Sequence, residues 1–476
     1  MPPFEWTTLL AATGLVCLHG LGLLHILHVL MRGRTAQGTI AWIVCMAVAP
    51  WIAIPFYWIA GRRRFTGYIR ARRTGDCELR KASEDMHLRL RHFELKPTDA
   101  FAKDAEILGG LPFTRGNSIE LLIDGDRTFR AIFDAIDSAE HYILVNFFIV
   151  KNDRVGQRFK DALIRRANAG VRVYFLFDEI GSHKLSRSYL SELRQAGVEC
   201  HSFGTNRHWW SRLQINFRNH RKIVVTDGHT AFIGGLNVGD EYLGRDQRFG
   251  RWRDTHLRLQ GPCVQAIQLV FLEDWNWAAD AYPKLSWDCH ARTDDQAVAI
   301  LPTGPADPAD SWQLTVAEAC NTARERIWIA SPYFVPDQGV LTALQAAAIR
   351  GVDIRILIPE KADHLLVWLA AFTFYEETLP YGIRLLRYHG GFLHQKAMLV
   401  DDRYAFVGTA NLDNRSFRLN FEITAVSTDA GFIDEVTHML ETDFLQARDA
   451  TLEDFDQRPF GFRLAARAAR LCAPVL

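Results

Sequence analysis

The chain has 476 residues, of which 48% are hydrophobic and 23% are charged, and this balance excludes a disordered protein. Basic and acidic residues number 55 each, so the zero net charge gives no sign of an acidic partner such as nucleic acid. The eight cysteines form no C-x-x-C pair, which argues against a disulfide framework or a zinc site.

Two apolar runs open the chain, from Phe4 to Met31 and from Gly38 to Gly61. Each run is long enough to cross a bilayer, which needs roughly 20 apolar residues. Pro50 and Pro55 fall within the second run and allow a kink or a re-entrant shape. The runs predict a transmembrane hairpin over residues 1–61, and the alternative is a buried hairpin in a soluble domain. Three histidines of the first run can face a partner helix: His19, His25 and His28.

A dense group of basic residues follows the second run, whereas the turn between the runs has only Arg32 and Arg34. Basic residues next to a membrane span favour the cytoplasmic side. We therefore predict that residues 62–111 form a basic juxtamembrane linker, and that the rest of the chain lies in the cytoplasm. The basic residues are Arg62, Arg63, Arg64, Arg70, Arg72, Arg73, Arg80 and Lys81.

From about Pro112 onward, helices and strands alternate, and the same order occurs twice. Hydrophobic periodicity predicts a helix and a strand at 155–168 and 169–178, and again at 339–349 and 350–358. The preceding helix and strand of each unit are predicted at 131–136 and 141–149, and at 312–322 and 326–334. This order indicates a duplicated α/β unit with mainly parallel sheets covered by helices.

The two units are separated near a linker that is rich in proline and glycine, Pro302 to Pro308. Their glycines between helix and strand, Gly170 and Gly351, are 181 positions apart. We place the first unit at 112–295 and the second at 296–476.

Each unit contains a His-x-Lys-x4-Asp motif, followed at identical offsets by glycine and asparagine. One such motif in a chain of this length is unremarkable, whereas two copies with the same offsets indicate function. The first copy comprises His220, Lys222, Asp227, Gly234 and Asn237, and the second comprises His394, Lys396, Asp401, Gly408 and Asn411.

The residue types of the motif suit chemistry at phosphorus. Histidine and lysine at positions i and i+2 project from the same face of a strand. Histidine attacks or transfers protons near neutral pH, lysine offers positive charge to a phosphate oxygen, and asparagine adds a neutral donor. These residues predict one phosphoryl-transfer site built from both units, and the arrangement requires no metal or other cofactor.

The two motifs resemble those of the phospholipase D superfamily. The N-terminal hairpin, the order of the units and the segment from Gly408 to Glu422 are similar to its bacterial cardiolipin synthases. The resemblance covers nearly the whole chain. It implies two repeated phospholipase D-like α/β sandwich domains with mixed, mainly parallel sheets, preceded by an N-terminal transmembrane helical hairpin. Thr409 stands where members often have serine, and the hydroxyl is kept.

Members of the superfamily use an acidic residue downstream of each motif to orient its histidine. Glu422 matches this position in the second unit. Asp254 is the better candidate in the first unit, although its offset from His220 is six residues longer than that of Glu422 from His394. Read without the family, each acid would be a solvated or salt-bridged carboxylate.

The resemblance implies transfer of a phosphatidyl group from one phosphatidylglycerol to another, giving cardiolipin and glycerol, through a phosphatidyl-histidine intermediate. We prefer His220 as the nucleophile and His394 as the general acid and base. The phosphate is expected to be held by Lys222, Lys396, Asn237 and Asn411. Asp227 and Asp401 complete the predicted catalytic set, but they match family positions that are often structural.

The expected partners are phosphatidylglycerol and other membrane phospholipids in the bacterial inner membrane, and no nucleic acid is expected. A membrane phospholipase D or phosphatidyltransferase with another donor or acceptor fits the motifs equally well. A nuclease fits the hairpin and the neutral charge poorly. A non-catalytic membrane scaffold is disfavoured because both motifs are intact. Lipid specificity, oligomeric state and membrane geometry stay open.

Three further segments have two interpretations each. Trp209-Trp210 can contact the membrane interface or pack under a loop. Leu365 to Tyr375 can line an acyl-chain groove or form a core helix. Arg458 to Leu476 is basic and apolar, and it can lie on the membrane or pack back on the domain.

Overall fold

The structure, a computed structural model, describes residues 4–33, 36–61, 65, 68, 77–204 and 216–476. Its contacts divide the chain into two units, Met1–Phe65 with Thr205–Asn216, and Thr66–Gly204 with Phe217–Leu476. We call the second unit the body, and each unit is described by itself. Most of the predicted basic group, including Arg62–Arg64, Arg70, Arg72 and Arg73, lies outside the described residues, and so does Trp209-Trp210.

The N-terminal unit has one helix that is long and apolar enough to cross a membrane, Thr8–Arg32, among the residues that the structure describes. The second apolar run is not one continuous helix, because Ala49 leaves the helical conformation with φ −140° and ψ 63°. Pro50 follows it, and a residue before proline avoids the α region. The helices are α1 (Phe4–Arg32), α2 (Ala36–Val48) and α3 (Pro50–Phe56), followed by a π-helical turn, Tyr57–Gly61.

The histidines of α1 face the second run, as expected. Trp58 Nε1 donates a hydrogen bond to His25 Nε2 at 3.0 Å. The His28 ring stacks on Trp58 with 5.8 Å between centroids. Val29 and Met46 are fully buried between the helices. Imidazole groups on an apolar helix are thus paired within the unit.

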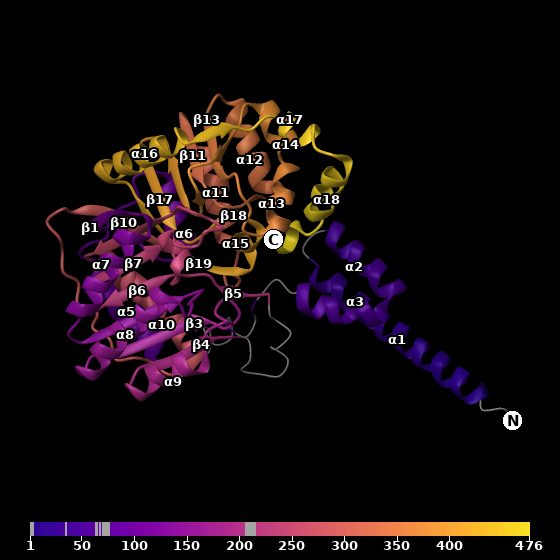
Figure 1. Ribbon diagram of the computed structural model, residues 1–476, viewed down its shortest axis with the longest axis horizontal. Helices are drawn as coiled ribbons and strands as arrows, with labels where there is room; N and C mark the ends of the chain where they lie inside the picture. The colour runs from indigo at the N-terminus through magenta and orange to yellow at the C-terminus, as the bar shows by residue number, and fades with distance from the viewer. Residues whose placement is uncertain (1–3, 34–35, 62–64, 66–67, 69–76, 205–215) are drawn as a thin grey trace. The chain divides into compact units, whose positions relative to one another are not determined.

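One sheet runs through the body (Figure 1), and it has sixteen strands in the part of the chain that the structure describes. Its order is β20-β14-β13-β11-β16-β17-β19-β10-β1-β9-β7-β6-β2-β3-β4, with β5 beside β19. The first half contributes β1 (Thr114–Ile123), β2 (Tyr142–Phe147), β3 (Arg172–Asp178), β4 (Glu199–Phe203), β5 (Arg218–Asn219), β6 (Ile223–Thr226), β7 (Thr230–Gly234) and β9 (Thr255–Gln260). The second half contributes β10 (Gln296–Thr303), β11 (Arg326–Ala330), β13 (Asp353–Pro359), β14 (Arg384–Tyr388), β16 (Ala397–Val400), β17 (Tyr404–Gly408), β19 (Asn420–Ser427) and β20 (Ala447–Asp449).

The strand order confirms a repeated α/β architecture with mixed sheets. The two halves meet where β1 pairs with β10, Thr114 opposite Val298. β1 and β10 begin close to the predicted unit boundaries of 112 and 296. Since the halves share one sheet, the boundaries 112–295 and 296–476 remain a proposal.

Parallel pairing does not dominate the sheet, so this part of the prediction is wrong. It is confined in the large sheet to the groups β2-β3-β4 and β11-β13-β14 and to the short strand β5. After each motif the chain turns back at once, from β6 to β7 and from β16 to β17. Asp227 and Gly228 both have positive φ, 54° and 71°, as tight hairpin turns require. The Asp227-Gly228 pair is typical of a tight hairpin turn, and it indicates antiparallel pairing of β6 with β7 already in the sequence.

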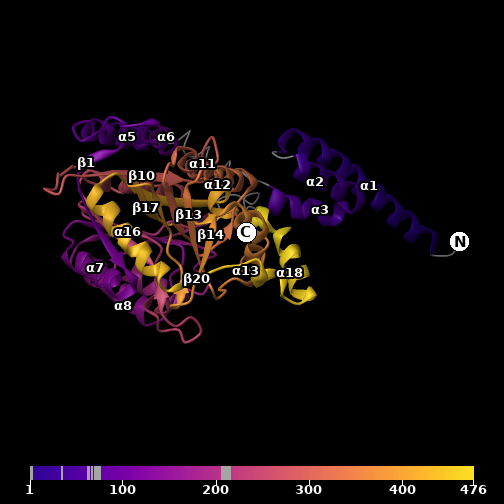
Figure 2. The same cartoon turned by 90° about the horizontal axis from the view of Figure 1, so that it is seen from above.

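Helices cover both faces of the sheet (Figure 2). Figure 2 shows α7, α8 and α16 on one side and α5, α6, α11 and α12 on the other. Their bounds are α5 (Cys77–Leu90), α6 (Ala100–Gly109), α7 (Asp124–Ser138), α8 (Arg154–Asn168), α9 (Arg187–Gln195), α10 (Cys263–Ala279), α11 (Ser311–Thr322), α12 (Gln338–Ile349), α13 (Leu365–Phe372), α14 (Tyr375–Thr378), α15 (Asn414–Arg418), α16 (Ala430–Phe444), α17 (Glu453–Asp456) and α18 (Phe460–Arg470).

The segment predicted as a juxtamembrane linker, 62–111, is partly built into the body. Asp99 caps α6 by accepting a hydrogen bond from Ala102 N at 2.8 Å. Phe101 and Ala105 of α6 lie in the core of the second half. Apolar side chains bury α6 against α11 and β10, so this part of the segment is not a linker.

The C-terminal segment packs back on the body. Ala466 and Ala469 of α18 are buried in the second-half core, and α18 contacts α13. In α13, Ala370 and Phe372 are core residues, so the core-helix interpretation holds for its inner face.

Asp227 and Asp401 belong to the scaffold, which corrects their place in the predicted catalytic set. Asp401 accepts hydrogen bonds from the backbone N–H groups of Arg324, Glu325 and Arg326 at 2.8–3.1 Å. Asp227 accepts in the same way from the N–H groups of Glu140, His141 and Tyr142 at the start of β2. Each aspartate stands seven positions after its histidine in extended chain, roughly 20 Å away at about 3.3 Å per residue.

We expect Asp401→Ala to lower the free energy of unfolding by roughly 2–3 kcal/mol, because three backbone donors lose their acceptor. Asp402→Ala is the matched control, since its side chain is 70% exposed. That variant should change stability by less than about 0.5 kcal/mol. Thermal unfolding of the detergent-solubilised protein measures both. If Asp401→Ala kept its stability but lost activity, Asp401 would have a catalytic role and not a structural one.

Candidate active site

The two motif histidines lie at equivalent places, just before β6 and β16. His220 and His394 are 8% and 7% exposed, and Lys222 and Lys396 are buried more fully. Lys222 Nζ donates to the carbonyl of His220 at 2.6 Å, which folds the lysine back along its own strand. Lys396 Nζ lies 2.9 and 3.1 Å from the two ring nitrogens of His394. Each half therefore presents one imidazole beside one ammonium group.

Each histidine is held by the acid of the other half. His220 Nδ1 lies 2.8 Å from Glu422 Oε2, and His394 Nδ1 lies 2.7 Å from Asp254 Oδ2. We expected each acid to orient the histidine of its own motif, and this pairing is wrong. The different sequence offsets of Asp254 and Glu422 from the histidines of their own halves therefore have no structural meaning, because each acid binds the histidine of the other half.

The backbone imposes this exchange. β5 pairs with β19, and the short strand β15 (Phe392–Leu393) pairs with β8 (Trp252–Arg253). His220 N donates to Phe421 O at 2.9 Å, and His394 N donates to Arg253 O at 2.8 Å. The residue before each acid is therefore fixed to the histidine of the other half.

The middle residue of each motif reinforces the junction. Arg221 Nη1 binds Asp274 Oδ1 at 2.7 Å, and its Nε donates to Glu422 O at 3.0 Å. In the second half, Gln395 accepts a hydrogen bond from Thr255 at 2.9 Å and donates to Asp443 at 2.8 Å. These buried polar groups connect the two halves directly behind the histidines.

Burial sets the protonation of the histidines. It lowers the pKa of His220 to about 4, against the opposing effect of Glu422 and with the help of Lys222. Burial and the charge of Lys396 likewise lower the pKa of His394 to about 4. Because a carboxylate only accepts, Nδ1 of each neutral ring carries the proton, and Nε2 keeps its lone pair.

The charges of the site balance. Burial raises the pKa of Glu422 and Asp254, but their histidine and lysine neighbours outweigh it and lower both pKa values below the ordinary range. Burial lowers the pKa of Lys222 to about 7 and that of Lys396 to about 8. Two carboxylates thus face two lysines whose pKa values lie near neutral pH. The negative charge of an entering phosphate would stabilise the protonated form of both lysines.

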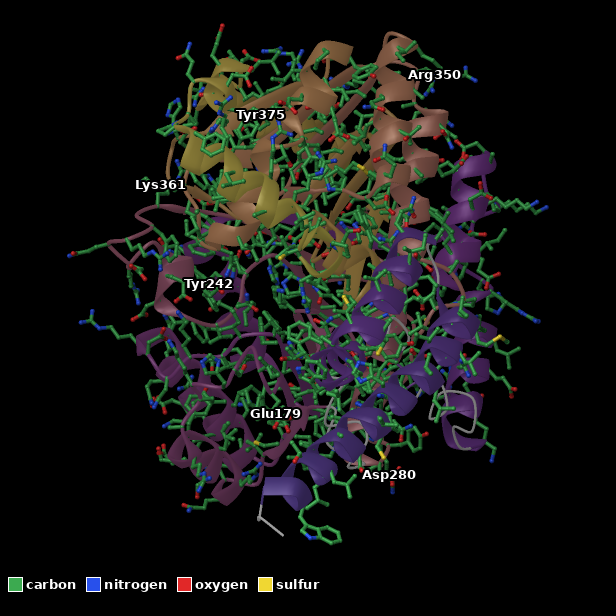
Figure 3. The ribbon with its side chains drawn as sticks, turned by 90° about the vertical axis from the view of Figure 1, so that its right-hand side faces the viewer. Glu179, Tyr242, Asp280, Arg350, Lys361 and Tyr375 are labelled. Atoms are coloured by element: carbon green, nitrogen blue, oxygen red, sulfur yellow. The ribbon has the colours of Figure 1, made fainter. Side chains whose placement is uncertain are left out.

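Asn237 and Asn411 are buried beside the motifs. Asn237 Nδ2 donates to the hydroxyl of Tyr242 at 3.0 Å, and Tyr242 is labelled in Figure 3. Asn411 Nδ2 donates to Asp413 at 3.2 Å. Among the described residues, no group of three or more His, Cys, Asp or Glu side chains is arranged as a metal site. The donors gathered here are ammonium and amide groups, which suit a phosphate.

Small and hydroxyl residues fix the acids, and sequence reasoning missed this role. A Cβ at Gly235 would lie 1.9 Å from Asp254 Oδ1, so only glycine leaves room for this carboxylate. At the equivalent position, Thr409 Oγ1 donates to Glu422 Oε2 at 2.6 Å. Ser416 donates to the other oxygen at 2.8 Å. The hydroxyl expected at Thr409 is present, but its contact with Glu422 depends on the fold.

A family model described as the phospholipase D-like domain of cardiolipin synthase matches residues 132–250 and 316–445. Cardiolipin synthase A of Pseudomonas putida strain W619 is 45% identical over 479 residues, covering 96% of this chain and 97% of the relative. Cardiolipin synthase A of Pseudomonas aeruginosa strain LESB58 is 43% identical over 474 residues, covering 97% and 95%.

The fold is also similar to the crystal structure of a phosphatidylserine synthase from Haemophilus influenzae Rd KW20. The TM-score is 0.60 at 16% identity, and the match covers 79% of this chain and 100% of that chain. The fold and the paired motifs define a phosphatidyltransferase of the phospholipase D type. Within that class, the chain belongs to the cardiolipin synthase family.

We expect Gly235→Ala to reduce kcat by roughly tenfold or more, because the new methyl group displaces Asp254 and frees the His394 ring. Gly461→Ala is the matched control, since a Cβ there meets nothing within 4 Å. Activity is measured in mixed micelles alongside thermal unfolding. Full activity of Gly235→Ala would show that the Asp254 contact does not position His394.

Proposed function

We propose that the enzyme transfers a phosphatidyl group from one phosphatidylglycerol to the hydroxyl of another, giving cardiolipin and glycerol through a phosphatidyl-histidine. One observation carries the proposal: two neutral imidazoles, each anchored through Nδ1 by the carboxylate of the other half, share one centre with two lysines. A nucleophile and a separate acid–base group are what a two-step displacement needs.

His220 is the proposed nucleophile. Its Nε2 has no hydrogen-bond partner among the described residues, whereas Nε2 of His394 lies 3.1 Å from the Lys396 ammonium. In the first step, Nε2 of His220 attacks the donor phosphorus and the bond to the glycerol oxygen breaks. The negative charge of the bound phosphodiester favours protonation of His394, and the imidazolium, held by Asp254, gives its Nε2 proton to the departing oxygen and becomes neutral.

In the second step, a terminal hydroxyl of the acceptor gives its proton to His394, and its oxygen attacks the phosphorus. The bond from phosphorus to His220 breaks, which restores the enzyme. Lys222, Lys396, Asn237 and Asn411 are the proposed ligands of the phosphate oxygens, because they are buried donors beside the histidines. Glu422 and Asp254 keep the rings oriented and stabilise each imidazolium as it forms.

Other donors or acceptors remain possible for the same machinery, including water, which would make the enzyme a phospholipase D. The relatives in Pseudomonas are named cardiolipin synthases, and this favours phosphatidylglycerol in both roles. The complete pair of motifs argues against a scaffold without activity.

For the membrane, we propose that residues 1–61 form the anchor and that the body lies on the cytoplasmic side of the bacterial inner membrane. The length and composition of Thr8–Arg32 support one pass. The break at Pro50 divides the second run into two helices, so this run enters the membrane as a kinked or re-entrant segment. The body comprises two phospholipase D-like domains at 112–295 and 296–476.

Expression in cells that lack cardiolipin tests the function. We expect wild type to restore cardiolipin, and His220→Ala to reduce its formation roughly 10³-fold or more, because the nucleophile is lost. With purified His394→Ala and a donor whose leaving group, p-nitrophenolate, needs no proton, a phosphatidyl adduct should accumulate on His220. His438→Ala, an exposed histidine on α16, is the control and should act as wild type. A stable adduct on His394 but none on His220 would reverse the assignment.

A second prediction concerns pH. As pH rises through about 7 to 8, Lys222 and Lys396 of the empty site lose their protons, and the attraction for the anionic phosphodiester weakens. We expect kcat/KM to fall in this range through a rising KM, while kcat stays level because bound phosphate raises both pKa values. Kinetics at constant ionic strength measure this. A fall in kcat alone would show that the lysines do not bind the ground-state phosphate.

A further inference from the structure

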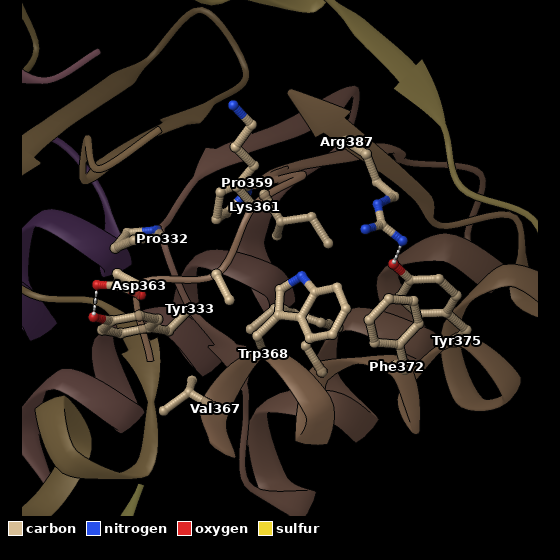
Figure 4. Close-up of a pocket in the computed structure, with 14 residues that line it drawn as sticks. Pro332, Tyr333, Pro359, Lys361, Asp363, Val367, Trp368, Phe372, Tyr375 and Arg387 are labelled. Atoms are coloured by element: carbon tan, nitrogen blue, oxygen red, sulfur yellow. Dashed lines mark hydrogen bonds between the residues drawn. The ribbon is translucent and has the colours of Figure 1, made fainter. Parts of the chain in front are cut away.

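A groove opens in the second half where the chain leaves β11 and β13 (Figure 4). Tyr333 and Asp363 form a polar wall, and Val367, Trp368 and Phe372 of α13 form an apolar wall. The apolar segment Leu365 to Tyr375 was expected to line an acyl-chain groove or to form a core helix. The inner face of α13 meets the core, and Val367, Trp368 and Phe372 also line this groove.

The polar wall is built around a carboxylate. Tyr333 Oη donates to Asp363 Oδ2 at 2.5 Å, as the dashed line in Figure 4 shows. The backbone N–H of His364 donates to Oδ1 at 2.6 Å. The Asp363 side chain is 16% exposed and lines the groove, and its carboxylate has lone pairs for further hydrogen bonds beyond these two.

This wall adjoins the reacting centre. Ser331 Oγ donates to Tyr333 O at 2.8 Å and accepts from Leu412 N at 3.0 Å, directly after Asn411. The charge of Asp363 also opposes the lowering of the pKa by burial at both His394 and Lys396. Asp363 is therefore within electrostatic reach of the second-half motif.

The equivalent position of the first half carries no carboxylate. With the repeat offset of 181, the position equivalent to Asp363 is Ser182. Ser182 Oγ is buried and bonded to the backbone on both sides, to Phe148 O and from Val150 N at 3.0 Å. In the first half this position thus has the buried, neutral hydroxyl of Ser182. In the second half it has the carboxylate of Asp363, which lines a groove. The two histidines are thus not in equivalent surroundings.

We propose that the Tyr333–Asp363 wall is a binding site for a polyol headgroup, which places one hydroxyl of glycerol at His394. Asp363 accepts a hydrogen bond from the hydroxyl that does not react, and the apolar wall covers the glycerol carbons and excludes water. The reacting hydroxyl then lies at the histidine assigned as acid and base. The inference rests on the proposed function and specifies which alcohols the site accepts.

The test uses the full-length enzyme in mixed micelles with a donor whose leaving group is p-nitrophenol. This donor forms the phosphatidyl-enzyme without a glycerol leaving group, so p-nitrophenol release reports the first step alone. Glycerol and 1-propanol then compete at equal concentration as acceptors, and water gives phosphatidic acid. The three products separate recognition of the second hydroxyl from general reactivity.

Wild type should prefer glycerol over 1-propanol. In Asp363→Asn and Tyr333→Phe the preference should fall about tenfold or more, because a hydrogen bond to a charged group is lost or weakened. Because both alcohols compete for the same phosphatidyl-enzyme, this ratio does not depend on the rate of p-nitrophenol release, and phosphatidic acid should rise relative to transfer products. Asp402→Asn removes an exposed carboxylate of the same half and should match wild type.

Unchanged preference in both variants, with normal unfolding temperatures, would overturn the proposal. A shift in preference for acyl-chain length instead would assign the groove to a lipid tail, which also overturns it. Equal loss of all products would mean that Asp363 only supports the fold. Failure of wild type to form cardiolipin or to release p-nitrophenol would instead reject the proposed function itself.

Discussion

The contact between each histidine and the carboxylate of the opposite half is the constraint on which the body depends. Both contacts are short, and backbone hydrogen bonds from His220 to Phe421 and from His394 to Arg253 hold them in register. A single half would have an imidazole without its orienting acid. The duplicated unit therefore forms one site, and the continuous sheet through β1 and β10 is the frame that keeps the two contributions aligned.

The site concentrates charge in a buried place and balances it. Four ionisable side chains, two acidic and two basic, surround two imidazoles that burial keeps neutral. Desolvation weakens the ammonium form of both lysines until an anion arrives. A phosphodiester is such an anion, and its single negative charge completes a set of groups that is otherwise close to neutral. Binding and activation of the substrate thus depend on the same desolvation.

Symmetry of the fold does not make the halves equal. Gly235 leaves space for the short Asp254, whereas Thr409 donates to the longer Glu422. Ser182 is bound to backbone, while Asp363 borders a groove. A two-step transfer needs one histidine that bonds to phosphorus and another that exchanges protons with alcohols. Small differences at equivalent positions support the proposed division of roles between the two histidines.

The sequence by itself determined the repeat, the elements of each half, the motif residues and the apolar N-terminus. Periodicity and spacing are local properties, so they are readable along the chain. Only the tertiary structure decided which acid serves which histidine, because those contacts join residues 202 and 140 positions apart. It also decided that antiparallel pairs outnumber parallel ones, that α6 belongs to the body and that Asp227 and Asp401 bind backbone. Pairing across a sheet depends on where distant strands meet, and no local pattern encodes that.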